Sequence, residues 1–172
     1  MQQIVSFFWQ MCLLRQNPEN LPSNRFNVGL ILFFYVVIAL IAVALTRSTH
    51  SPLNIVGIVF IGVSIQATLT WSVLAFKKLT QRFTATWASL LGTNSFMLVI
   101  LVPVNLLLLN TENQSLILLA DSISWICHGW WLAIAGHIYH KAVNISLLQG
   151  SAIAFLTELL SVMATITLFP QA

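Results

Sequence analysis

The 172-residue chain is 58% hydrophobic and only 6% charged, whereas a soluble domain usually carries about a quarter charged residues. A water-soluble fold of this composition could not cover its own surface. Seven Lys and Arg against four acidic residues give a net charge of +3, but the basic residues lie between apolar runs and form no dense patch, which excludes a nucleic-acid-binding module. We therefore expect one all-α membrane domain over residues 1–172, with no separate extramembrane domain.

The first predicted element is a short amphipathic helix over about residues 3–15. Its apolar side chains can share one helical face, as in a helix that lies in the membrane interface. This face comprises Ile4, Val5, Phe7, Phe8, Met11 and Leu14. The Asn17-Pro18 and Leu21-Pro22 steps should end the helix before the first span. A frayed N-terminus is the alternative interpretation.

Five later runs are long enough to cross the hydrocarbon core, which requires about 20 mostly apolar residues in a helix. The predicted spans are Val28 to Leu45, Leu53 to Phe76, Ala85 to Leu109, Leu116 to Tyr139 and Ile145 to Phe169. The runs exceed the length of a strand and lack the alternation of a membrane barrel, so the fold class is a five-helix transmembrane bundle. The short connections predict that consecutive helices pack antiparallel.

The distribution of basic residues predicts the orientation, because short cytoplasmic segments are rich in Lys and Arg. With the N-terminus in the cytoplasm, the cytoplasmic segments hold Arg15, Arg25, Lys77, Lys78, Arg82 and Lys141. The external segments then hold Arg47 alone. The expected topology is N-in/C-out.

Ionisable residues inside the spans require an explanation, because each costs at least about 2.5 kcal/mol at the bilayer centre. His128 and Glu158 lie near the middle of the fourth and fifth spans, and we expect them to form a hydrogen-bonded pair. The secondary candidates are Asp121, Ser124, His137 and Ser161. The fourth span also carries a ridge of small residues suited to close helix contact, formed by Gly129, Ala133 and Gly136. Uncharged polar residues of the other spans, among them Gln66 and Asn94, are interpreted as ordinary helix packing.

Two roles fit the predicted pair. A carboxylate and a histidine could exchange protons and so form part of a proton or cation relay. The alternative is a structural contact that joins two helices, which we favour because relays usually use ionisable residues on several helices. His137 and His140 share a helix face and could bind a metal with Asp121 or Glu158, but no established ligand motif is present. We expect no metal and no cofactor.

The order of elements includes two local patterns. The second loop leads into Arg82-Phe83, which is followed, after six intervening residues, by Leu90-Leu91-Gly92, and Gly136-His137-Ile138 with Lys141-Ala142 closes the fourth span. This layout resembles the small bacterial inner-membrane proteins related to the Yip1 type. The resemblance implies a multi-pass, non-enzymatic protein of the bacterial inner membrane, and it implies no functional residues.

The first functional hypothesis is a non-enzymatic protein of the lipid bilayer that acts through helix contacts, as a partner of another membrane protein, a scaffold or a homo-oligomer. The alternative is a small proton-coupled carrier or transporter that uses Glu158 and His128. A lipid-modifying enzyme is a third hypothesis, which would need His137, His140 or Asp121 as a reactive group at an interface. No catalytic constellation supports it.

Overall fold

A computed structural model describes residues 2–21, 24–46 and 51–169, with side chains from Val5 onwards. All regular structure in these residues is helical, and five helices are long and apolar enough to cross a membrane. The helices are α1 (Gln2–Cys12), η1 (Pro18–Asn20), α2 (Arg25–Thr46), α3 (Pro52–Phe76), η2 (Thr80–Arg82), α4 (Phe83–Asn110), α5 (Gln114–Val143) and α6 (Leu147–Leu168), where η denotes a short 3₁₀ turn. The prediction of five membrane-span helices is confirmed.

The starts of two spans follow from local sequence. Pro52 occupies the first turn of α3, where its missing N–H removes no helical hydrogen bond. The Ser51 hydroxyl accepts from the backbone N–H of Asn54 at 3.3 Å and caps the same turn. At α6, Ser146 and Gln149 form a reciprocal capping box. Each cap satisfies backbone donors that would otherwise be unpaired at the helix start.

The end of the fourth span lies further along the chain than predicted. Instead of ending near Tyr139, α5 continues for another turn to Val143 and ends where Asn144 adopts the left-handed conformation, with φ 53°. His140 and Lys141 therefore lie in the last turn of the helix and not in a loop. A cation in this position is favoured by the partial negative charge of a helix C-terminus.

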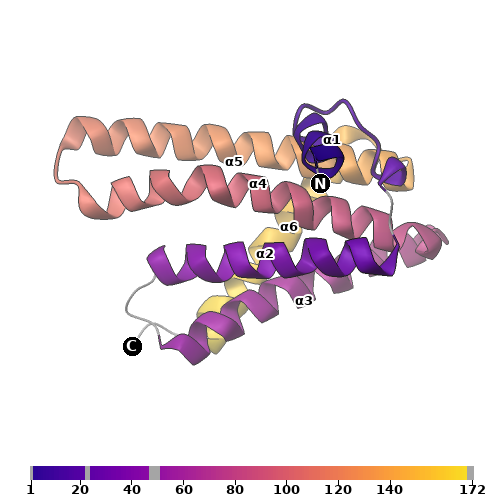
Figure 1. The fold of residues 1–172 in the computed structure, drawn as a ribbon, viewed down its shortest axis with the longest axis horizontal. Coiled ribbons are helices and arrows are strands. Elements are labelled where there is room, and N and C mark those ends of the chain that lie inside the picture. Colours follow the sequence, from indigo (N-terminus) through magenta and orange to yellow (C-terminus); the bar gives the residue numbers. More distant parts are fainter. Residues whose placement is uncertain (1, 22–23, 47–50, 170–172) are drawn as a thin grey trace.

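The five long helices form a closed ring in the order α2, α4, α5, α6, α3. Figure 1 shows α4 and α5 as a hairpin beside α2, with α6 crossing behind them. The most extensive packing of α2 is on α4, and that of α3 is on α6. Consecutive helices are thus close neighbours for α4 with α5 and for α5 with α6, whereas α3 and α4 meet only sparsely. The prediction of sequential pairing is correct for part of the bundle only.

One end of the ring carries basic residues at the termini of four helices, and we call it the basic end. It holds Arg25, Lys77, Lys78, Arg82 and Lys141. Arg82 Nη1 lies 2.6 Å from the Glu19 carboxylate and donates to the Ala142 carbonyl at 3.0 Å. This side chain thereby joins η1 to the start of α4 and the end of α5. Arg47, which completes the predicted charge asymmetry, lies outside the described residues.

The N-terminal helix α1 packs against α4 and α5 and is viewed end-on in Figure 1, across the long helices. Phe8 and Met11 are buried, and Trp130 Nε1 donates to the Cys12 carbonyl at 2.9 Å. Val5 and Leu14 of the predicted apolar face are exposed instead, and the side chain of Ile4 lies outside the described part of the chain. In the structure, α1 is a docked helix and not a frayed terminus.

The predicted cause of the end of this helix is wrong. The helix stops at Cys12, well before Pro18, because Leu14 takes the left-handed conformation with φ 60°. The Arg15 N–H then returns to the Gln10 carbonyl at 2.9 Å, which is the hydrogen bond of a Schellman C-cap. The second predicted stop, at Pro22, lies outside the described residues.

Candidate functional site

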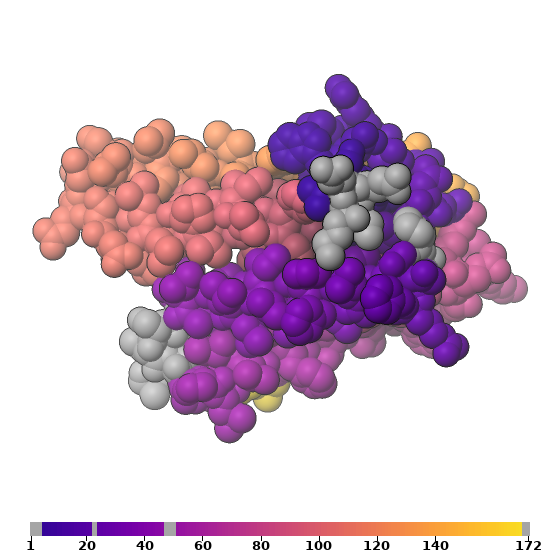
Figure 2. Space-filling model, in the orientation of Figure 1, coloured from indigo at the N-terminus to yellow at the C-terminus, as the bar shows by residue number. Residues whose placement is uncertain are grey.

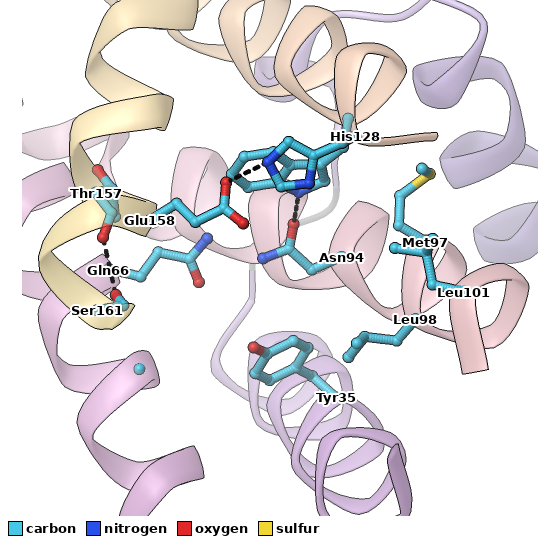
Figure 3. A pocket seen from close by; sticks show the side chains of 12 residues that line it. Tyr35, Gln66, Asn94, Met97, Leu98, Leu101, His128, Thr157, Glu158 and Ser161 are labelled. Atoms are coloured by element: carbon cyan, nitrogen blue, oxygen red, sulfur yellow. Dashed lines mark hydrogen bonds and ion pairs between the residues drawn. The ribbon is translucent and has the colours of Figure 1, made fainter. Parts of the chain in front are cut away.

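All five long helices line an open cavity of about 230 Å³. It is lined by Tyr35, Gly62, Gln66, Asn94, Met97, Leu98, Leu101, His128, Trp131, Thr157, Glu158 and Ser161, most of which are labelled in Figure 3. One water takes about 30 Å³ in the liquid, so the cavity has room for several waters or one small solute. Figure 2 shows the molecular surface hollowed between α2 and the α4–α5 hairpin.

His128 and Glu158 both line this cavity and face each other (Figure 3), with 3.0 Å between His128 Nε2 and Glu158 Oε2. The structure therefore contains the contact expected from the sequence. The exposed fractions of the two side chains are 37% and 33%, so the pair is not sealed between α5 and α6. Pairing offsets the cost of desolvation, and Glu158 Oε2, the oxygen that faces His128, is itself buried.

Uncharged polar groups from the other helices converge on the same space. Trp131 Nε1 donates to Asn94 Oδ1 at 2.6 Å and links α5 to α4 beside His128. Gln66 approaches from α3 and Tyr35 from α2. The sequence predicts only a packing role for Gln66 and Asn94, and it does not identify Tyr35 or Trp131 as site residues. A usable signal was present, because Tyr35 interrupts an otherwise wholly apolar span.

Three secondary candidates occupy different environments. Ser161 lines the cavity one turn after Glu158, and its hydroxyl donates to the Thr157 carbonyl at 2.8 Å. Asp121 is exposed and Ser124 is half-buried, and neither lines the cavity. The structure thus brings Ser161 to the pair and leaves the two residues of α5 away from it.

His137 and His140 lie towards the basic end and do not line the cavity. His137 Nε2 lies 3.1 Å from the Gln16 carbonyl oxygen, and His140 Nδ1 is hydrogen-bonded to the Ile145 carbonyl. These contacts hold the segments before α2 and before α6 against α5. Within residues 2–21, 24–46 and 51–169, no three His, Cys, Asp or Glu side chains gather in a way that could hold a metal ion.

Towards the basic end, a buried hydrogen bond closes the cavity. The Thr70 and Tyr139 hydroxyls are 2.9 Å apart, and the two residues are 0% and 1% exposed. They lie one turn beyond Gln66 on α3 and about three turns beyond His128 on α5, both in the direction of the basic end. Leu74 and Leu90 fill the core around Tyr139. The cavity therefore has a packed floor on this side.

No protein-family model, curated protein or solved structure matches the chain. The chemistry of the cavity is therefore the basis on which a function can be assigned.

Proposed function

We propose that the protein is a small proton-coupled carrier in which His128 and Glu158 are the proton-binding unit. The observation that supports this proposal is the position of the pair in the wall of an accessible cavity formed by five helices. A contact that served only to join α5 to α6 would be expected between these helices, out of reach of solvent. Intramembrane ionisable residues that face a water-filled space commonly mark solute or proton pathways, and carrier sites commonly lie near the bilayer midplane between helices.

In this proposal the pair exchanges one proton. With one proton shared, it is neutral overall, either as imidazolium with carboxylate or as imidazole with carboxylic acid. Loss of this proton leaves one negative charge facing the cavity. A solute that supplies positive charge or hydrogen-bond donors can then replace the proton, which couples solute binding to proton release.

The floor of the cavity suggests how access would alternate. We assign the basic end to the cytoplasm, which gives the N-in/C-out topology, and we place the protein in the inner membrane of a bacterium, as the Yip1-type layout implies. The Thr70–Tyr139 contact then closes the cavity on the cytoplasmic side. Separation of these two hydroxyls would open a cytoplasmic route.

The assigned orientation can be tested by cysteine labelling in intact cells. Thr80 and Asn113 lie at opposite ends of α4, and both are exposed. In a background without Cys12 and Cys127, a membrane-impermeant maleimide should label Asn113→Cys in intact cells, and should label Thr80→Cys only after the cells are permeabilised. Labelling of both from one side would overturn the topology.

Carriage itself is tested in proteoliposomes that contain a pH-sensitive dye. Addition of a panel of small solutes should produce a solute-dependent pH change with the native chain, and Glu158→Gln and His128→Gln should abolish this change. Glu112→Gln is the matched control, because Glu112 is an exposed carboxylate in the α4–α5 loop. A Glu158→Gln variant that is folded and retains the full pH change would refute the proposal.

A second candidate is action through a membrane partner or a homo-oligomer, without any enzymatic activity. It is favoured by Asp121, which is exposed about two turns into α5, next to the 70% exposed Trp125. A carboxylate on the outer face of a span is costly in lipid and is stabilised by a polar partner. Crosslinking from Trp125→Cys in membranes should then trap a dimer or a second protein, and a chain that remains monomeric would exclude this candidate.

A further inference from the structure

We propose that the cavity is a binding site for a small organic monocation with an apolar body, held by its charged group at Glu158 and by its apolar part against α4. This inference rests on the proposed function and specifies its substrate class. It follows from three properties of the cavity: its charge, its aromatic groups and the separation of its polar and apolar walls.

The charge of the lining favours a cation over an anion. Among the described residues, no Lys or Arg side chain lines the cavity, and the carboxylate of Glu158 is its acidic group. Besides the pair itself, the titratable residue in the lining is Tyr35, on α2, whereas α3 and α4 contribute the uncharged Gln66 and Asn94. The cavity is therefore neutral with one proton on the pair and negative without it, and in neither state does it attract an anion.

Aromatic rings provide further contacts for a cation. The His128 ring lies between two tryptophans, with centroid distances of 6.4 Å to Trp125 and 5.9 Å to Trp131. Of these tryptophans, Trp131 lines the cavity, and Tyr35 lies on the opposite wall (Figure 3). A tryptophan or tyrosine face attracts an ammonium group by about 0.5 to 2 kcal/mol, and more strongly away from water.

The opposite part of the cavity is apolar. Met97, Leu98 and Leu101 lie along one side of α4 and face the space beside Tyr35, away from Glu158 and Gln66 (Figure 3). A hydrophilic cation such as a bare metal ion would leave these side chains without a partner and would find no cluster of ligands. A ligand with one charged end and a hydrocarbon body matches both walls, and a volume of about 230 Å³ limits it to a small molecule.

The test measures binding of labelled benzyltrimethylammonium to the purified full-length chain in dodecylmaltoside, by equilibrium dialysis. Two unlabelled competitors share its size: neopentylbenzene, in which carbon replaces the charged nitrogen, and the anion benzenesulfonate. Protein-free micelles give the background. We expect one saturable site per chain that neither competitor occupies, and release of up to about one proton per bound cation in weakly buffered solution near neutral pH.

Two variants locate the site. Glu158→Gln should weaken binding by at least about tenfold and abolish proton release, whereas Glu112→Gln should leave both unchanged. Leu98→Trp keeps the carboxylate and fills the apolar side, so it should also weaken binding. Each variant is compared only when its size-exclusion profile and helical circular dichroism match those of the native chain.

The outcomes separate this inference from the proposed carrier. Equal binding of the cation, its neutral isostere and the anion, or no saturable binding of the cation, would overturn the cation site. If such a chain still produced a Glu158-dependent pH change with another solute, carriage would stand and the substrate class would be wrong. If the cation bound at Glu158 and no solute changed the internal pH, the site would stand and carriage would fail.

Discussion

Gly136 of α5 and Gly150 of α6 lie so close together that a Cβ atom on Gly150 would overlap the carbonyl oxygen of Gly136. The two backbones are therefore in direct contact, as small residues permit in membrane helix pairs. The contact also allows the Ser151 hydroxyl to donate to the Leu132 carbonyl at 3.1 Å. The same two helices carry His128 and Glu158, each about two turns from this contact.

Gly150→Ala should consequently separate α5 from α6. The overlap is with backbone, which cannot rotate away, so we expect a loss of about 1 to 3 kcal/mol in the free energy of unfolding. Gly129→Ala, also on α5, is the control, because a Cβ there meets no atom within 4 Å and should be neutral or stabilising by up to about 1 kcal/mol. Unfolding in detergent by sodium dodecyl sulfate titration measures both, and equal losses would contradict the assigned contact.

The buried hydroxyl pair that closes the cavity should show energetic coupling. Thr70→Val and Tyr139→Phe each remove one partner, and each leaves the other hydroxyl buried without this bond. Hydrogen bonds between membrane helices contribute about 0.6 kcal/mol on average and up to about 1.7. We therefore expect the double variant to lose less stability than the sum of the single losses, by an amount in this range. Strict additivity in the double-mutant cycle would show that the contact is not formed.

The number and type of the helices could be predicted from sequence, but not their neighbours. A run of about 20 apolar residues forms a helix in a bilayer, because a helix pairs its own backbone N–H and C=O groups by hydrogen bonds. Which helices pack together depends on which small residues allow the backbone of another helix to approach. Of the predicted ridge, Gly136 makes the close contact, with Gly150 of α6, whereas Gly129 is exposed. The partner glycine lies on another helix, so periodicity within α5 could not identify it.

The candidate site was predictable in its charged part only. His128 and Glu158 are costly unless paired, and the short connection between their helices left few alternatives. Uncharged polar residues impose no such requirement, because a hydroxyl can bond its own helix, as Ser161 does to the Thr157 carbonyl. The convergence of Asn94, Gln66 and Tyr35 arises from the ring order of the helices, which local sequence does not encode.

Arg82 and Glu19 should contribute unequally to stability, although they form one ion pair. The side chains are 29% and 48% exposed, and pairs of this kind usually contribute less than about 1 kcal/mol. Glu19→Gln should therefore cost less than about 1 kcal/mol. Arg82→Met should cost more, about 1 to 3 kcal/mol, because it also removes the donor to the carbonyl of the fully buried Ala142. Thermal unfolding in detergent distinguishes the two, and equal effects would show that the bond to Ala142 contributes nothing.

The thiol of Cys12 reports whether α1 stays docked. Burial against the bundle raises its pKa from the ordinary value of 9.0 to about 11, so the reactive thiolate is scarce at neutral pH. In a Cys127→Ala background, Cys12 should therefore react with a maleimide at pH 7.5 far more slowly than a cysteine at the exposed neighbouring position, Leu13→Cys in a chain without Cys12 and Cys127. Equal rates would mean that α1 leaves its site readily, as the frayed-terminus interpretation requires.

The same thiol gives a pH dependence with a defined sign. Below about pH 9, both the folded and the unfolded chain carry the neutral thiol, and Cys12 contributes no pH dependence. Between about pH 9 and 11, the unfolded chain loses the proton first, because only the folded state has the raised pKa. The free energy of unfolding should therefore fall across this interval in the native chain relative to Cys12→Ala, by up to about 1.4 kcal/mol per pH unit. Parallel stability profiles for the two chains would show that Cys12 is solvated, and that the contact of α1 with α4 and α5 does not persist in solution.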